Sequence, residues 1–163
     1  MFSVGEKVIY GAVGVCLITD IIENELTGVM REYYVLRPVD SDKSVIYVPT
    51  NNEKLVSRMR EVPSSQKLRE TIKDIKGKEL LWIDNNLERS ESFRAILSDG
   101  DIESVAVLFR TLHKRREELS ERGKRLVKSD ENLYRECSKL LCSEFAIILS
   151  LEQSQVLSLI LEP

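Results

Sequence analysis

The apolar residues in the first third of the chain are spaced as in short β-strands. β-branched and aromatic side chains, which favour strands, are concentrated in four runs: Val8–Tyr10, Val13–Ile22, Tyr33–Leu36 and Val45–Val48. Glycines and the Asp40–Asp42 stretch lie between these runs and predict tight turns. Pro49 has no amide hydrogen to give to a sheet, so we expect it to end the last strand.

After Pro63 the apolar spacing changes to that of helices. It predicts three successive helices, over residues 66–75, 86–97 and 102 to about 120. Ser64 or Ser65 is suited to cap the first helix, and Asp101 to cap the third. Gly123 lowers helix propensity by about 1 kcal/mol relative to alanine, so we expect a break near residues 120–123.

Two more helices complete the predicted C-terminal half. A long helix follows the break, with an apolar stripe that runs from Leu126 to Ile148. Ser150 and Gln153 have the spacing of a capping box, which would open a last short helix that ends at Leu161. The two halves together predict an α+β protein. A small N-terminal SH3- or Tudor-like β-barrel is expected in residues 1–62, and an all-helical domain in residues 63–163.

Composition narrows the class of protein. The chain has 163 residues, of which 42% are hydrophobic and 31% charged, as in ordinary globular proteins and unlike disordered or collagen-like ones. No apolar run approaches the roughly 20 residues that span a membrane, and the first residues lack the layout of a signal peptide, so we expect a cytoplasmic protein. Its three cysteines include no Cys-x-x-Cys pair, and we expect them to be reduced and buried.

Charge is unevenly distributed along the chain. The net charge is −3, which disfavours a protein that coats nucleic acid indiscriminately. Residues 110–128, however, hold eight basic side chains and three acidic ones, whereas residues 129–163 have a net charge of −4. A helical hairpin would gather the basic side chains on one surface suited to duplex phosphates. Three glutamates interleave with them, so an ordinary solvated face is the competing interpretation.

The sequence shows no persuasive catalytic, cofactor or metal site. Its one histidine, His113, lies in the basic helix with no serine or cysteine nucleophile nearby, and we expect a surface residue. Gly11–Gly14 is a fragment of a glycine-rich phosphate loop without its lysine, third glycine and following helix, so a turn is the better interpretation. We therefore expect a protein that is not an enzyme.

Several sequence blocks occur together in an order that is specific. Residues 2–15 read Phe-Ser-Val-Gly-Glu-Lys-Val-Ile-Tyr-Gly-Ala-Val-Gly-Val, and this opening closely resembles that of the CarD/CdnL family of bacterial transcription regulators. The resemblance continues almost to the end of the chain, through Tyr33–Leu36, Ile46–Pro49, Leu97–Ile102, Leu108–Arg115 and Gly123–Arg125.

The resemblance implies two binding activities. In this family the Tudor-like domain, which transcription-repair coupling factors share, docks on the β lobe of the RNA polymerase β subunit, largely by adding a strand edge. The helical domain holds promoter DNA upstream of the melted region, mainly through phosphates, and the two contacts change the lifetime of the open complex. The corresponding polymerase-binding candidates here are Arg31, Tyr33, Val45, Ile46, Tyr47 and Val48. The DNA-binding candidates are Trp82, Arg89, Arg110, Lys114, Arg115, Lys124, Arg125 and Lys128.

The chain departs from the family pattern at a tryptophan. Many members place a tryptophan that wedges into the minor groove fifteen residues before the aspartate of the Gly-Asp pair, and Asn86 occupies that position here. Trp82, four residues earlier, is suited to a core role as well as to a DNA contact, whereas Arg89 matches the arginine that follows the family's tryptophan. Tyr47 takes a position that is basic in some relatives, which predicts a less electrostatic polymerase contact.

A second function is compatible with the same residues. The acidic net charge and the displaced tryptophan also suit a protein–protein adaptor whose helical domain does not contact DNA. We expect a monomer in either case, and a domain-swapped dimer through the β domain remains an alternative. Nucleoid association would follow from binding to polymerase.

Overall fold

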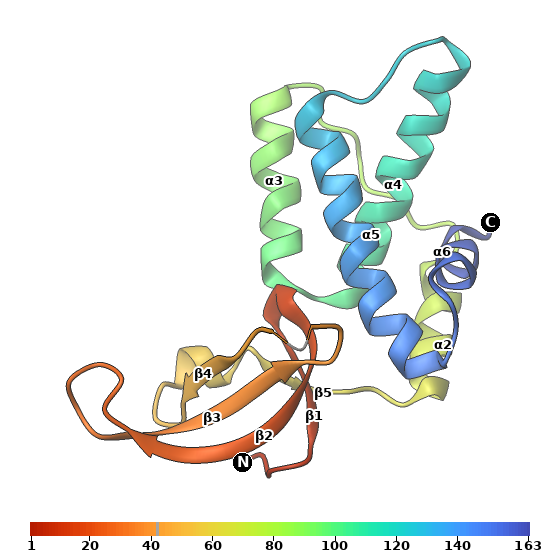
Figure 1. The fold of residues 1–163 in the computed structure, drawn as a ribbon. Helices are drawn as coiled ribbons and strands as arrows, with labels where there is room; N and C mark the ends of the chain where they lie inside the picture. Colours follow the sequence, from red (N-terminus) through yellow and green to blue (C-terminus); the bar gives the residue numbers. More distant parts are fainter. Residues whose placement is uncertain (42) are drawn as a thin grey trace. The chain divides into compact units, whose positions relative to one another are not determined.

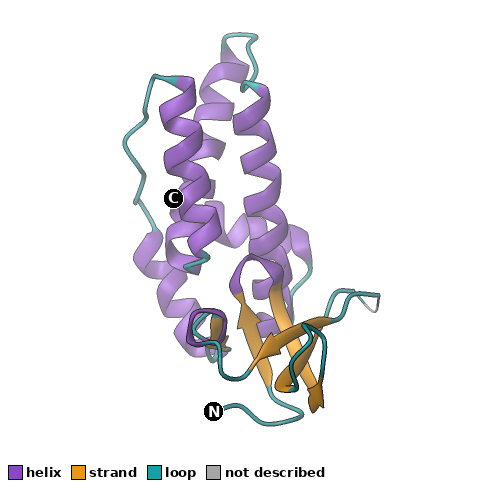
Figure 2. Cartoon of the chain, turned by 90° about the vertical axis from the view of Figure 1, so that its left-hand side faces the viewer, coloured by secondary structure: helices purple, strands orange, loops and turns teal. Residues whose placement is uncertain are grey.

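The computed structural model describes residues 1–41 and 43–163, and the predicted turn at Asp40–Asp42 includes Asp42, which lies outside these residues. The chain divides into two compact units, Met1–Val62 and Pro63–Pro163. The first unit is a sheet with two short helices, and the second consists of helices (Figures 1 and 2). This order of elements confirms the predicted α+β class.

Five strands form one antiparallel sheet in the order β4-β3-β2-β1-β5. The strands are β1 (Lys7–Tyr10), β2 (Gly14–Asn24), β3 (Arg31–Pro38), β4 (Ile46–Pro49) and β5 (Met59–Glu61). β4 and β5 are the two edges within the described residues, so the sheet is open and not the closed barrel that we expected. Its size and strand order remain compatible with a Tudor-like fold.

One apolar cluster holds the sheet together, and every strand contributes to it. Buried members include Val8 of β1, Ile18 of β2, Leu36 of β3, Val48 of β4 and Met59 of β5. Side chains alternate between the two faces of a strand, so the buried positions follow from the spacing of apolar residues.

Short connections close the sheet unit. Gly14 has a φ of 99° where β1 turns into β2, after a single 3-10 turn, η1 (Gly11–Val13). Strand β4 ends as expected at Pro49, and α1 (Glu53–Val56) then leads to β5. Asn52 caps α1, because its side-chain oxygen accepts a hydrogen bond from the Leu55 amide at 3.1 Å.

The helical unit consists of five helices. They are α2 (Ser65–Ile75), α3 (Asn86–Asp99), α4 (Ile102–Glu121), α5 (Lys128–Leu149) and α6 (Gln153–Leu161). Two of the predicted caps are confirmed: Ser64 accepts from the Lys67 amide at 3.1 Å, and Asp101 accepts from the Ser104 amide at 3.1 Å. Gly100 ends α3 in the left-handed conformation that glycine adopts most easily.

The predicted capping box of α6 is wrong by two residues. Ser150 instead ends α5 with a φ of 54°, and Glu152 is the N-cap of α6. The Glu152 amide donates to Oε1 of Gln155 at 2.9 Å, so the glutamine of the box is Gln155 and not Gln153. Two overlapping capping patterns occur in this segment, and the sharp end of α5 selects the later one.

The helices of this unit share one apolar core. Each contributes large buried side chains, such as Leu68 of α2, Phe93 of α3, Phe109 of α4, Leu141 of α5 and Ile160 of α6. α3, α4 and α5 run side by side along the unit (Figure 1). This packing places the start of α3, the end of α4 and the start of α5 at one end.

No helix among the described residues is by itself long and apolar enough to cross a membrane; α5 and α6 pass that test only as a pair, with a bend of 104° between them.

Candidate functional site

Basic side chains gather at the end of the helical unit where α4 turns into α5. Residues 122–127 form this turn, and the first turn of α3 lies at the same end (Figure 1). We define the basic turn as Lys124, Arg125 and Lys128, all of which are exposed. Their side chains form no ion pair or hydrogen bond with any other residue that the structure describes. Their charges are therefore available to a partner.

Arg89 lies beneath this surface and not on it. Its guanidinium is buried and forms a bidentate ion pair with the buried carboxylate of Asp130, with Nη2 to Oδ2 at 2.7 Å and Nε to Oδ1 at 3.1 Å. Nη1 donates to the carbonyl of Ile83 at 2.8 Å, and Nη2 also donates to Oδ1 of Asn86 at 2.8 Å. A buried guanidinium with its donors engaged in this way offers none to a phosphate in this arrangement, which disfavours the predicted direct contact of Arg89 with DNA.

The Arg89 pair instead fixes three segments relative to one another. Arg89 belongs to the first turn of α3, and Asp130 to the first turn of α5. The carbonyl that Arg89 holds at Ile83 belongs to the loop before α3. The buried pair thus positions the segments that surround the basic turn.

Trp82 packs into the same end of the core. Its ring meets that of Phe93 edge to face, with centroids 5.9 Å apart. The guanidinium carbons of Arg89 and Arg115 lie 4.6 Å and 5.1 Å from its centroid. These contacts hold the indole as a half-buried support, as expected for a core role.

Three further cations predicted to bind DNA differ in the partners that they already have within the protein. Nη1 of Arg110 donates to the carbonyls of Ile160 and Glu162 at 2.6 and 2.7 Å, which ties α4 to the C-terminal end of α6. Nη1 of Arg110 thus has a structural role, and the contact of Arg110 with DNA stays a prediction. Lys114 and Arg115 are more accessible, but each has a carboxylate partner: Glu79 at 2.9 Å and Glu118 at 3.7 Å. The hydrogen bond to Glu79 raises the pKa of Lys114.

Sequence reasoning missed a set of exposed apolar side chains at this end. Leu81 is 92% exposed and Leu87 70%, and Val127 within the turn is also exposed. Leu87 lies two positions before Arg89, so the two side chains project to nearly opposite faces of α3. The sequence contains one indication that Leu87 is exposed, because Leu87 does not fit the helical spacing of the buried residues Phe93 and Leu97.

His113 is half-buried and packs against aromatic side chains. Its Nδ1 lies 3.0 Å from the hydroxyl of Tyr134, whose ring stacks on Phe109 with centroids 4.9 Å apart. Burial is the main cause that lowers the pKa of His113; nearby Arg116 lowers it further, and Glu117 opposes the shift. The imidazole is thus part of an aromatic stack on α4 and α5.

The cysteine thiols are poor nucleophiles and poor ligands. All three are free and buried. Burial raises the pKa of Cys16 to about 11 and that of Cys137 to about 12, and it also raises the pKa of Cys142. Within residues 1–41 and 43–163 no cluster of three or more His, Cys, Asp or Glu side chains is arranged to hold a metal ion.

In the sheet unit, β4 is an edge strand whose outward backbone can be derived from its register. Thr50 donates its amide to the Glu32 carbonyl at 3.0 Å, and Tyr34 then pairs with Val48. Hydrogen-bonded pairs alternate in an antiparallel ladder, so the amide and carbonyl of Tyr47 point away from β3. The Tyr47 side chain is 44% exposed and meets the Tyr33 ring edge to face at 6.4 Å.

β3 is an interior strand, because β2 and β4 pair with its two sides. Tyr33 therefore offers no free strand edge, and a polymerase contact by the hairpin that contains Arg31 stays a prediction. Tyr33 is buried, whereas Arg31 is exposed at the hairpin end of β3. Val45 and Ile46 are half-buried, and Val48 is part of the sheet core.

The hairpin between β2 and β3 has an apolar tip that the sequence analysis did not identify. Leu26, Val29 and Met30 are 48, 55 and 61% exposed. Their position in the sequence could have indicated this exposure, because they lie in a predicted turn, where apolar side chains have little to pack against.

Comparison with known proteins gives a direct result. A family model described as the CarD-like/TRCF RID domain matches residues 2–62, and one described as the CarD C-terminal domain matches residues 67–161. No curated protein matches the chain. The two domain matches follow one another in the order of the sheet unit and the helical unit. The chain belongs to the CarD family of transcription regulators that interact with RNA polymerase.

Proposed function

We propose that this protein regulates transcription initiation by binding two partners at once. The edge of β4 holds the β lobe of the RNA polymerase β subunit, and the basic turn holds promoter DNA upstream of the bubble. Binding of both changes the lifetime of the open complex. The observation that carries the DNA half is the set of three exposed cations, Lys124, Arg125 and Lys128, without carboxylate partners among the described residues.

The charge pattern supports contact with phosphates. Lys128 is the first residue of α5, where the helix dipole disfavours a cation. A duplex phosphate beside it would remove that cost. Lys114 and Arg115 flank the basic turn and can extend the contact once they exchange their carboxylate partners for phosphate. Such contacts position DNA without reading its sequence.

The apolar support beneath these cations has a role in the same proposal. The Trp82 ring contacts the guanidinium groups of Arg89 and Arg115, and Arg115 is the more exposed of the two. We propose that Trp82 orients Arg115 toward DNA and does not itself insert between base pairs. Arg89 and Asp130 hold that arrangement from below.

The sheet edge supports the polymerase half. An exposed strand with outward backbone groups is suited to receive a strand of the partner. Pro49 has no amide hydrogen, so the added strand finds outward donors only before it, at Tyr47. Tethering to polymerase then raises the effective concentration of DNA at the basic turn. A protein with a net charge of −3 can therefore hold DNA with few cations.

Charge reversal tests the DNA half in the complete chain. The double variant Lys124→Glu with Arg125→Glu should weaken binding to promoter DNA in the polymerase complex by roughly tenfold or more, and by a similar factor for unrelated sequences. The matched control reverses Arg69 and Lys73, two exposed cations on α2 at the opposite end of the helical unit (Figure 1). Equal DNA affinity of both double variants would contradict the assignment.

A pair of substitutions at one position tests the polymerase half. Tyr47→Ala removes the side chain and keeps the outward amide, whereas Tyr47→Pro also removes the amide. We expect calorimetric binding to the β lobe to fall by about a further tenfold from alanine to proline, as one lost backbone hydrogen bond predicts. Circular dichroism of both variants checks that the sheet is intact. Wild-type affinity in both would exclude β4 as the contact.

One observation favours a second function, that of a protein adaptor. Leu81 and Leu87 are more exposed than any other apolar side chains of the helical unit in the described residues, and they flank the DNA-binding candidates. They suit a partner with an apolar surface better than they suit phosphates. Loss of DNA binding in the charge-reversed variant separates the two functions, because the adaptor requires no cations.

A further inference from the structure

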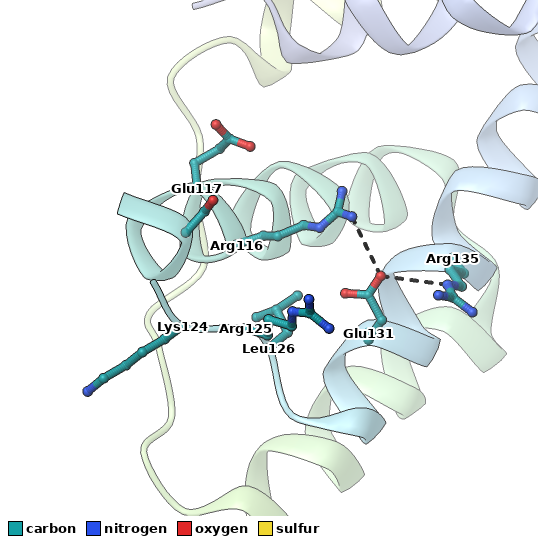
Figure 3. A pocket seen from close by; sticks show the side chains of 8 residues that line it. Arg116, Glu117, Lys124, Arg125, Leu126, Glu131 and Arg135 are labelled. Carbon is teal, nitrogen blue, oxygen red and sulfur yellow. Dashed lines mark ion pairs between the residues drawn. The ribbon is translucent and has the colours of Figure 1, made fainter. Parts of the chain in front are cut away.

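A surface pocket beside the basic turn gathers three arginines around one carboxylate. It has a volume of about 630 Å³ and lies between the end of α4, the turn and the start of α5. Arg116, Arg125 and Arg135 point toward Glu131, whereas Lys124 and Glu117 point away from it (Figure 3). Two of these arginines, Arg116 and Arg135, belong to none of the contacts assigned above.

Glu131 satisfies these arginines poorly. Its Oε1 atom lies 3.7 Å from Nη2 of Arg116 and 3.6 Å from Nε of Arg135. Both distances are longer than a charge-assisted hydrogen bond, and both guanidinium groups share the same oxygen atom. Arg125 forms no ion pair within the described residues. Three positive charges therefore surround one negative charge.

The geometry leaves room for a second anion. Arg116 and Arg135 line the pocket and their side chains are 45 and 70% exposed, so a ligand from solvent can reach them. Arg116 also lies over the Tyr134 ring, with its guanidinium carbon 4.8 Å from the centroid, which restricts its motion. Planar guanidinium groups bind a tetrahedral oxyanion through paired hydrogen bonds, and the pocket volume is in the range of small-ligand sites.

We propose that this pocket is a phosphate-binding site in which a phosphate takes the place of Glu131 as the partner of Arg116, Arg125 and Arg135. The inference extends the proposed DNA-binding function and shares Arg125 with it. A phosphate of the DNA backbone and a free polyphosphate present the same chemistry to these side chains. In either case Glu131 competes with the ligand, so neutralising this carboxylate strengthens binding.

The experiment uses the complete chain and two matched pairs of variants. Glu131→Gln removes the competing carboxylate, and its control is Glu136→Gln, which neutralises an exposed carboxylate of the same helix. Arg135→Gln removes a ligand-binding guanidinium, and its control is Arg94→Gln, since Arg94 pairs with Glu136 outside the pocket. Calorimetry measures the affinity of each variant for inorganic triphosphate and, separately, for a promoter duplex.

The expected changes have opposite signs. Glu131→Gln should raise phosphate affinity about two- to fivefold, and Arg135→Gln should lower it by a similar factor, as partly exposed ion pairs predict. Both controls should bind like the wild type. Opposite shifts for triphosphate alone identify a free polyphosphate site, and opposite shifts for the duplex alone identify a DNA phosphate. Opposite shifts for both show that triphosphate and DNA phosphates use the same pocket.

One result overturns the inference. If Glu131→Gln and Arg135→Gln bind both probes like their controls, the pocket holds no phosphate. The proposed DNA function would survive that result, provided the Lys124 and Arg125 double variant still loses DNA binding. If the double variant instead keeps its DNA binding, while Glu131→Gln and Arg135→Gln shift triphosphate affinity in opposite directions, the pocket assignment is retained and the DNA assignment is removed.

Discussion

The edge of β4 and the basic turn offer partners different kinds of chemistry. At β4 the available groups are the backbone amide and carbonyl of Tyr47, fixed in direction by the ladder with β3. At the basic turn they are long cationic side chains, fixed only at their bases. The first surface is directional and nearly neutral, whereas the second is charged and adaptable.

The two surfaces also depend on the fold below them in different ways. The outward backbone of β4 exists as soon as the sheet forms, since all five strands share one core. The basic turn depends on an additional contact, because the buried pair of Arg89 with Asp130 holds the first turn of α3, the loop before it and the first turn of α5 in place. Damage to that pair should affect the charged surface and leave the sheet edge intact.

The largest expected effect follows from this contrast. Asp130→Ala leaves the buried guanidinium of Arg89 without its counter-ion and should lower the free energy of unfolding of the helical unit by about 3–5 kcal/mol. Urea denaturation followed by tryptophan fluorescence measures it, because Trp82, the only tryptophan, belongs to that unit. Binding to the β lobe should persist at urea concentrations where DNA binding is lost.

An exposed ion pair provides the control for Asp130→Ala. Glu136→Ala removes the partner of Arg94, whose side chain is about half exposed, and should cost less than about 1 kcal/mol. Similar decreases in the free energy of unfolding of the two variants would mean that burial does not determine how much the Arg89 pair contributes to stability.

Features that depend on neighbouring residues in the chain could be predicted from sequence, whereas features that depend on distant residues could not. The elements of both units follow from local patterns: runs of β-branched and aromatic residues for the strands, and 3.6-residue spacing with caps such as Ser64 and Asp101 for the helices. Capping at α6 could not be resolved, because Ser150 and Glu152 both offer a side-chain acceptor and only the end of α5 excludes the first.

The site was harder to predict than the fold, for a physical reason. Arg89 and Arg110 lie in helices and Arg125 in the turn between two helices, but sequence gives all three the same charge. Tertiary contacts separate them: Asp130 and the α6 carbonyls use two of the three guanidinium groups, and the third is free. The partners of Arg89 and Arg110 lie about 40 and 50 residues away in the chain, so no local pattern predicts them.

The second effect in size is the response of the two surfaces to salt. If Lys124, Arg125 and Lys128 contact phosphates, DNA affinity should fall about 40-fold between roughly 50 and 200 mM monovalent salt. Binding to the β lobe should change far less over the same range, because backbone hydrogen bonds release no condensed counterions. Parallel titrations of both partners against the complete chain measure the two slopes. Equal slopes would remove the distinction between a directional edge and a charged turn.

A smaller effect separates the two apolar side chains near the basic turn. Trp82→Ala removes a ring that packs on Phe93 and should lower stability by about 2 kcal/mol, less than a fully buried ring would. Leu87→Ala removes a side chain that is 70% exposed and should change stability by less than about 0.5 kcal/mol. Urea denaturation followed by circular dichroism compares them, since the first variant lacks the fluorophore. If Leu87→Ala lowers stability more than Trp82→Ala does, Trp82 is not the structural support and Leu87 is not a mere surface residue.

The smallest expected effect is a pH dependence confined to the helical unit. Folding lowers the pKa of His113 from its ordinary value of 6.5, mainly through burial against the Phe109–Tyr134 stack. The unfolded chain therefore binds more protons as the pH falls through 6.5, so the stabilisation is complete above that pH and decreases toward the lower pKa of the folded state. His113→Gln keeps a hydrogen-bonding partner for Tyr134 and removes the titration. Between pH 7.5 and 5 the wild type should lose more stability than this variant in thermal melts, and β-lobe binding by the sheet edge should not follow that difference. Parallel stability profiles of the two proteins would show that carboxylates, and not His113, determine the acid sensitivity of this unit.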